Sequence, residues 1–92
     1  MGNPTRVGST NELRACVWLM SLGYEAYRSQ CHTGPVDIIA LNPETGETIY
    51  IDVKTRSKSK VFTWHRLSDA QKALGVKILI VDEQGCEFQK EN

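Results

Sequence analysis

The chain has 92 residues, and its eleven Lys and Arg balance eleven Asp and Glu, so the net charge at neutral pH is zero. This length suits one domain with a modest core, and we expect residues 1–92 to form a single unit. No apolar run approaches the roughly 20 residues that a membrane-spanning helix needs, and nothing resembles a signal peptide. The three cysteines form no C-x-x-C pair, which indicates reduced thiols in an intracellular, cytoplasmic setting.

The first regular element is expected to be a helix that follows a flexible start. Residues 1–8 contain Gly, Pro and Asn without periodicity, so we expect them to be unstructured. Residues 9–12, read as STNE, have the pattern of a capping box led by Ser9. Helical spacing then predicts one buried apolar face, formed by Leu13, Cys16, Val17 and Met20. Gly23 suits the end of this helix.

A predicted strand over residues 24–29 leads through a loop to a β-hairpin. Two apolar runs, residues 36–41 and 48–53, flank a break that contains Pro, Asn and Gly. With symmetric closure, Leu41 faces Thr48. Counting back then sets three charged side chains on one side of the sheet, namely Asp37 opposite Asp52 and, two residues further on, Lys54. The other side is an unbroken apolar face, made by Val36, Ile38, Ala40, Ile49, Ile51 and Val53.

The opposed carboxylates of Asp37 and Asp52 conflict with each other. At about 4 Å their repulsion is roughly 4 kcal/mol when the effective dielectric constant is about 20. A bound divalent cation removes this conflict, and carboxylate oxygens are ligands that Mg²⁺ prefers. The alternative is an Asp–Lys salt-bridge cluster on a solvated strand face, and the pattern alone leaves both open.

A basic region follows the hairpin. Residues 53–81 hold seven Lys and Arg against one Asp. Residues 55–60 form either a solvated loop or a phosphate-binding arm, and Lys and Arg at a phosphate supply affinity and position. We predict nucleic-acid contacts from this region and from the preceding loop, by Arg56, Lys58, Lys60, Lys72 and His32. Residues 61–65 suit a short strand, whose Phe62 and Trp64 either pack in the core or stack on bases.

The last third of the chain predicts a helix and two strands. Ser68 begins a second capping box that Gln71 closes, and Gly75 ends the helix. A buried strand over residues 76–82, a turn and a short strand over residues 86–89 complete the chain. The order of elements predicts an α/β or α+β fold, in which a mixed sheet of about five strands carries flanking helices.

The hairpin motif resembles that of the PD-(D/E)xK nuclease superfamily. Gly34-Pro35-Val36-Asp37, then Asp52-Val53-Lys54, match its acidic residue at the start of one strand and its acid-x-Lys triplet on the next. Glu12 on the preceding helix and Gln71 on the later helix occur in the family's order. Val36 departs from a strict Pro-Asp pair. The chain is most similar to the small Holliday junction resolvases and VRR-NUC nucleases, which implies a restriction-endonuclease-like core.

The resemblance also implies a set of catalytic roles. It assigns Mg²⁺, with Mn²⁺ as a substitute, to the carboxylates of Asp37 and Asp52 and to the backbone carbonyl of Val53. Lys54 would orient the attacking water and stabilise charge on the phosphate. Glu12 either completes the metal shell or only caps its helix. Gln71 either contacts a carboxylate or the substrate phosphate, or only closes its capping box.

The expected activity is that of a metal-dependent endodeoxyribonuclease. The domain is too small to carry a separate sequence-reading module, so we expect it to select branched or junction DNA by shape, with a partner protein for targeting left open. Paired cuts would need two sites, which favours a homodimer. The rival hypothesis is a catalytically idle nucleic-acid-binding or assembly module with a nuclease-like fold. A small protein without a nucleic-acid role is disfavoured by the local excess of positive charge.

Overall fold

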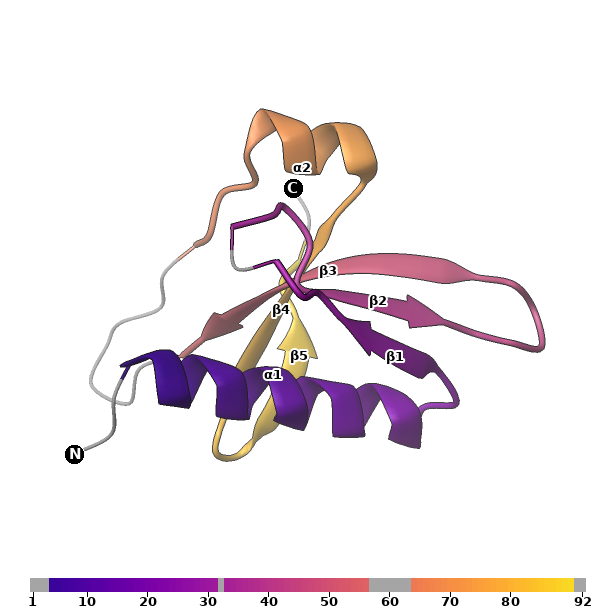
Figure 1. Ribbon diagram of the computed structural model, residues 1–92, viewed down its shortest axis with the longest axis horizontal. Helices are drawn as coiled ribbons and strands as arrows, with labels where there is room; N and C mark the ends of the chain where they lie inside the picture. Colours follow the sequence, from indigo (N-terminus) through magenta and orange to yellow (C-terminus); the bar gives the residue numbers. More distant parts are fainter. Residues whose placement is uncertain (1–3, 32, 57–63, 91–92) are drawn as a thin grey trace.

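The computed structural model describes residues 4–31, 33–56 and 64–90, and within these ranges the fold is a mixed sheet with two helices. The elements follow one another as α1 (Pro4–Ser21), β1 (Glu25–Arg28), β2 (Ile38–Leu41), β3 (Thr48–Thr55), α2 (Asp69–Leu74), β4 (Lys77–Asp82) and β5 (Gly85–Phe88) (Figure 1). Among the described strands the order is β1-β2-β3-β4-β5, and only the β3–β4 pair is parallel. This arrangement is compatible with a restriction-endonuclease-like core, so the predicted fold class is confirmed.

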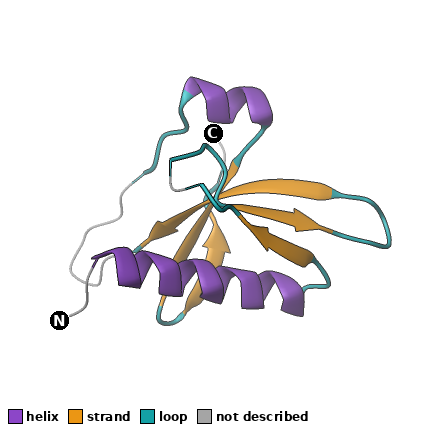
Figure 2. Cartoon of the chain, viewed as in Figure 1, coloured by secondary structure: helices purple, strands orange, loops and turns teal. Residues whose placement is uncertain are grey.

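The two helices lie on opposite sides of the sheet. Figure 2 shows α1 running along one face, whereas α2 lies beyond the other face. The core fills the space between α1 and the sheet, and its buried members are Ala15, Cys16, Leu19, Ile38, Ala40, Ile51, Leu79 and Val81. The sheet face away from α1, which we call the open face, therefore carries the side chains that alternate with these core residues.

The hairpin has the predicted register. The β2–β3 pairs run from Leu41↔Thr48 to Ile38↔Ile51. Its loop is closed by hydrogen bonds between the Asn42 and Glu47 backbones and from the Gly46 N–H to the Asn42 carbonyl, both 2.8 Å long. Gly46 has a φ of 79°, a conformation that glycine adopts without steric cost. The register directs the apolar side chains of the hairpin toward α1, as the alternation predicts.

Strand β3 extends two residues beyond the predicted end of the hairpin because β4 lies alongside it. Asp52 pairs with Ile78 and Lys54 pairs with Ile80 in parallel register, and the crossover between the two strands contains α2. Paired residues point to the same face of a sheet. Asp52 and Lys54 therefore share the open face with Ile78 and Ile80.

Helix α1 begins earlier than the sequence pattern predicts. It starts at Pro4, so the expected flexible segment is wrong for residues 4–8, and Ser9 lies inside the helix instead of capping it. Proline is favoured at the first helical position because its fixed φ suits the helix and its missing N–H would have no partner there. The predicted end is confirmed, since Gly23 has a φ of 95° and its N–H donates to the Met20 carbonyl.

The buried face of α1 also differs from the prediction. Leu13, Val17 and Met20 are 52%, 63% and 54% exposed, whereas Ala15 and Leu19 are fully buried, and of the predicted four only Cys16 faces the core. Asn11 is buried on the same side, where its Nδ2 donates to the Thr55 Oγ1 over 2.8 Å. The helix carries apolar residues on two sides. The side with the small Ala15 and the hydrogen-bonding Asn11 is the one that packs against the sheet.

The C-terminal elements match the prediction closely. Ser68 and Gln71 form the expected capping box of α2, and Gly75 ends it with a φ of 73°. Trp64 and His65 lie in no strand, and the other residues of that predicted strand, including Phe62, lie outside the described ranges. The three cysteines are free thiols, as predicted. Neither helix has the length and hydropathy to cross a bilayer over the residues that the structure describes.

Candidate active site

The end of β2 brings Asp37 against β3. The ladder of backbone pairs stops at Ile38, and the Asp37 N–H donates to the Ile51 carbonyl over 2.8 Å, one residue away from the position that the ladder would give. The Asp37 carboxylate reaches along β3, where its Oδ2 accepts a 2.8 Å hydrogen bond from the Val53 N–H. This bond fixes Asp37 beside the segment of β3 that carries Asp52.

The environment of Asp37 opposes its negative charge. Burial raises the pKa of its carboxyl to about 6, with smaller contributions from the neighbouring Asp52 and Glu12, while the hydrogen bond from the Val53 N–H acts in the opposite direction. The Asp52 carboxyl is one of the groups that raise this pKa, so the two carboxyl groups interact. The pairing of β2 with β3 ends at Ile38↔Ile51, so Asp37 is not the ladder partner of Asp52 that the sequence predicts. A bound cation would stabilise the charged form of both groups.

Asp52 and Lys54 complete the predicted cluster on the open face. The Asp52 side chain is only 12% exposed, and its Oδ2 lies 3.4 Å from the Lys54 Nζ. Lys54 is 41% exposed over its side chain, so its ammonium lies at the boundary between the carboxylates and solvent. The structure thus brings together Asp37, Asp52 and Lys54, and one ammonium stands against two carboxyl groups.

Glu12 lies near this cluster but is engaged elsewhere. Its Oε1 lies 3.2 Å from the Arg28 Nη2 on β1, and both side chains are about one third exposed. Because α1 begins at Pro4, Glu12 is not in the first helical turn, so the capping hypothesis is wrong. Within the described ranges, no three His, Cys, Asp or Glu side chains are close enough to hold a metal ion together.

The residues present still fit a hard divalent cation. Mg²⁺ usually binds one or two protein carboxylates, and waters and substrate phosphates complete its octahedral shell. Asp37 and Asp52 supply such a pair. The N–H and C=O of one strand residue point toward the same neighbour, and the Val53 N–H points to Asp37, so the Val53 carbonyl faces that side as well. The three predicted metal ligands, which are the two carboxylates and the Val53 carbonyl, therefore converge at the start of β2.

Gln71 links α2 to the loop that precedes Asp37. Its Oε1 accepts from the Ser68 N–H over 2.9 Å, which closes the capping box, and its Nε2 donates to the Pro35 carbonyl over 3.0 Å. The capping alternative is therefore confirmed. The contact with Pro35 is one that the sequence did not predict, because it depends on how α2 docks. Gln71 supports the position of Asp37 through the backbone two residues before it.

The predicted nucleic-acid contacts fall into three groups. Arg56 pairs with Glu87 and, over 3.5 Å, with Asp82, so its guanidinium joins the end of β3 to β4 and β5. Lys72 lines a cleft on the open face. The other predicted residues, His32, Lys58 and Lys60, lie outside the described ranges. Sequence reasoning missed Arg28, the partner of Glu12, because the contact depends on the packing of α1 against β1.

The mixed five-stranded sheet carries Asp37, Asp52 and Lys54 where the pairing of β2 with β3 ends. This arrangement defines a domain of the restriction-endonuclease-like type. The chain belongs to the family described as Uncharacterised protein family UPF0102, whose model matches residues 11–77. That match spans well over half of the chain and includes Glu12, Asp37, Asp52, Lys54 and Gln71. The family is a member of the restriction-endonuclease-like nuclease superfamily. No curated protein and no solved structure matches the chain significantly.

Proposed function

We propose that the protein is a metal-dependent endonuclease that hydrolyses phosphodiester bonds in DNA. One observation carries this proposal. The fold holds a half-buried Asp37 beside the buried Asp52, and burial together with the neighbouring Asp52 opposes the charge of the Asp37 carboxylate. A purely structural salt-bridge cluster needs only one acid for the one Lys54 ammonium. Two acids that share a site with one lysine are suited to a divalent cation.

The residues take distinct roles in the proposed reaction. Bound Mg²⁺ or Mn²⁺ supplies a Lewis acid that polarises the scissile phosphate and lowers the pKa of a bound water. Asp37 and Asp52 hold the cation with the Val53 carbonyl, and the Val53 N–H keeps the Asp37 carboxylate in place. Lys54 donates hydrogen bonds to the attacking water or to a phosphate oxygen as negative charge develops there. The products carry a 5′-phosphate and a 3′-hydroxyl.

The choice of substrate is proposed to rest on DNA structure. The described residues form one sheet with two helices and no separate sequence-reading module among them, so shape, a branch or a junction would direct this domain. One site cuts one strand, and a homodimer would provide the paired cuts that a junction requires. Sedimentation equilibrium with and without DNA tests this dimer, and a monomer at tens of micromolar under both conditions would contradict it.

The activity is tested by incubating labelled linear, nicked, branched and single-stranded DNA with Mg²⁺, Mn²⁺ or EDTA. We expect cleavage only with a divalent cation and fastest cleavage of a branched substrate. Asp52→Ala should abolish it, whereas Arg14→Gln, a change on α1 away from the open face, should leave it intact. Cleavage that survives in EDTA, or in Asp52→Ala, would contradict the proposal.

A second candidate function is favoured by the engagement of Glu12 with Arg28 and by the absence of a three-acid cluster among the described residues. In this alternative the domain binds nucleic acid without cutting it. Binding that weakens steeply between 50 and 200 mM salt, with no cleavage under any metal, would favour this module.

A further inference from the structure

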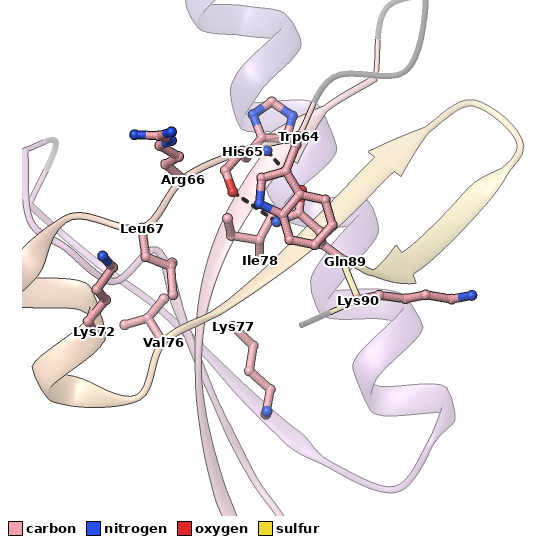
Figure 3. Close-up of a pocket in the computed structure, with 10 residues that line it drawn as sticks. All are labelled: Trp64, His65, Arg66, Leu67, Lys72, Val76, Lys77, Ile78, Gln89 and Lys90. Atoms are coloured by element: carbon pink, nitrogen blue, oxygen red, sulfur yellow. Dashed lines mark hydrogen bonds between the residues drawn. The ribbon is translucent and has the colours of Figure 1, made fainter. Parts of the chain in front are cut away.

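The open face carries a cleft next to the carboxylates. Its volume is about 510 Å³, and it lies between the segment after residue 63, α2, the start of β4 and the residues after β5. Among the described residues that line it, none is acidic, and four are Lys or Arg: Arg66, Lys72, Lys77 and Lys90. Figure 3 shows Arg66 and Lys72 on one side of the Trp64 ring and Lys90 on the other.

The cleft adjoins the proposed active site through the sheet itself. Ile78, which forms part of the cleft wall, is the β4 partner of Asp52 and shares its face. Gln89 continues the β4–β5 register, since its N–H donates to the Ile78 carbonyl over 2.9 Å. Asp52, Ile78 and Gln89 therefore form one row across the open face. Neighbouring strands lie roughly 4.8 Å apart, so the cleft begins one strand away from the carboxylates.

The segment that carries Trp64 is fixed by two hydrogen bonds. The His65 N–H donates to the Gln89 Oε1, and the Gln89 Nε2 donates to the His65 carbonyl, each over 2.9 Å. Both bonds are drawn in Figure 3. The side-chain amide of Gln89 thus holds the backbone beside Trp64 as a neighbouring strand would. Trp64 is 39% exposed, so part of its indole remains accessible while its backbone is held in place.

The lining combines an apolar wall with a cationic rim. Leu67, Val76 and Ile78 supply aliphatic contact, and the Trp64 indole supplies an aromatic surface. Proteins that bind single-stranded nucleic acid stack bases on aromatic side chains and follow the phosphates with Lys and Arg. The cleft volume falls in the range of sites for small ligands and suits one nucleotide. A base in an intact duplex is stacked and paired, so it cannot enter such a cleft.

We propose that this cleft receives an unpaired nucleotide of the DNA strand, with its base against Trp64 and its flanking phosphates against Arg66 and Lys72. The inference rests on the proposed function and names its substrate class, which is DNA with a single-stranded segment beside the cut. A flap, a fork or an opened junction supplies such a segment, whereas a blunt duplex does not. Trp64 is then a substrate-binding residue that selects unpaired DNA.

The test uses the indole of Trp64 as its own reporter. The chain has two tryptophans, so Trp18→Phe leaves Trp64 as the only one. Oligo(dT) and a blunt duplex of equal nucleotide number are titrated into this variant in EDTA, and fluorescence quenching is compared with anisotropy of labelled DNA. We expect oligo(dT) to quench Trp64 and to bind at least about tenfold more tightly than the duplex. Equal binding of both, or binding of oligo(dT) without quenching, would overturn the proposal.

Substitutions separate stacking from charge. In otherwise wild-type protein, Trp64→Ala should weaken oligo(dT) binding by about 5- to 150-fold, since a stacked base contributes about 1–3 kcal/mol, and Trp64→Phe should retain part of the affinity. Duplex binding should change little in either variant. Lys72→Gln should reduce the salt dependence of oligo(dT) binding, while Arg14→Gln removes the same charge on the far side of the sheet and should not. Unchanged oligo(dT) affinity in a folded Trp64→Ala protein would contradict the inference.

Failure of this inference is distinguishable from failure of the proposed function. The binding measurements contain EDTA and need no cleavage. Quenching of Trp64 by oligo(dT), with no cleavage when a divalent metal is added, would support the nucleotide-binding cleft and contradict the nuclease activity. Metal-dependent cleavage at equal rates on blunt duplex and flapped DNA, without quenching of Trp64, would support the nuclease activity and contradict the nucleotide-binding cleft.

Discussion

The two faces of the sheet are built from the same strands, but one carries apolar core residues and the other carries charged side chains. Toward α1, Ile51 and Leu79 are fully buried among other apolar side chains. On the open face, Asp52 and Lys54 alternate with these residues along β3, and a cationic cleft lies beside them. Because the side chains of a strand alternate in direction, a shift of one residue would exchange the two sets. The contrast assigns stability mainly to one face and chemistry mainly to the other.

The largest expected effect is the loss of DNA cleavage when Asp52, on the open face, is substituted. Asp52→Asn keeps the size of the side chain but removes a charge from the proposed cation site, so we expect cleavage to fall by on the order of a thousandfold or more. The free energy of unfolding should change little or rise. Cleavage assays beside urea unfolding check both. A large loss of stability in this variant would mean that the two faces do not divide the roles.

The next effect concerns the face under α1. Leu19→Ala should lower the free energy of unfolding by about 2–5 kcal/mol because Leu19 is fully buried against the sheet. Val17→Ala is the matched control, and since Val17 is 63% exposed it should cost less than about 0.5 kcal/mol. Urea unfolding measures both. Equal losses from the two variants would show that α1 packs with a different face.

A smaller effect is expected where α1 meets the end of β3. Asn11→Ala removes the hydrogen bond to the Thr55 Oγ1 and leaves space in a buried position, so it should cost about 1–2 kcal/mol. Thr55→Val with Asn11→Ala completes a double-mutant cycle in urea unfolding. A coupling energy near zero would mean that this bond does not position α1.

The smallest effect is a dependence of stability on pH. Because the pKa of Asp37 is raised to about 6 in the folded protein, its protonated form contributes stability at pH 4 that is lost as the pH rises through 6. Asp37→Asn removes this loss and leaves a side chain that can still accept from the Val53 N–H. Without divalent cations, the variant should be more stable than wild type by on the order of 1 kcal/mol at pH 7.5, after discounting for solvent screening, and equal to it near pH 4.

Thermal unfolding at both pH values, in EDTA, measures this difference. An Asp37→Asn variant that is less stable than wild type at pH 7.5 would show that the charged carboxylate stabilises the fold. It would also remove the main argument for a cation at this position.

The hairpin could be predicted from the sequence because its information is local. Alternating apolar residues and a six-residue break fix the register, and the register alone places Asp37 near Asp52. The one-residue shift in pairing at Asp37, whose N–H donates to the Ile51 carbonyl, could not be predicted from the local pattern. It depends on the loop around Pro35 and on the contact of Pro35 with Gln71.

Helix α1 and the cleft could not be predicted in the same way. Leu13 and Val17 are as apolar as the residues that pack, so helical spacing predicts the wrong buried face. The contact of Asn11 with Thr55, which marks the packed side, joins residues far apart in the chain. For Trp64 the sequence allows both core packing and base stacking. Its exposure and the bonds between His65 and Gln89 depend on how the end of the chain docks. Local pattern gives the acids, whereas long-range packing determines what surrounds them.

The most direct test of the central claim is binding of Mn²⁺, followed by electron paramagnetic resonance of the free ion, at pH 7.5 and pH 5. If Asp37 and Asp52 on the open face form a metal centre, wild-type protein should bind Mn²⁺ saturably at pH 7.5 and more weakly at pH 5, where Asp37 is protonated. The Asp52→Asn variant should show no measurable binding. Equal binding by wild type and Asp52→Asn, or no binding by either at millimolar Mn²⁺, would contradict the assignment of Asp37 and Asp52 as its ligands.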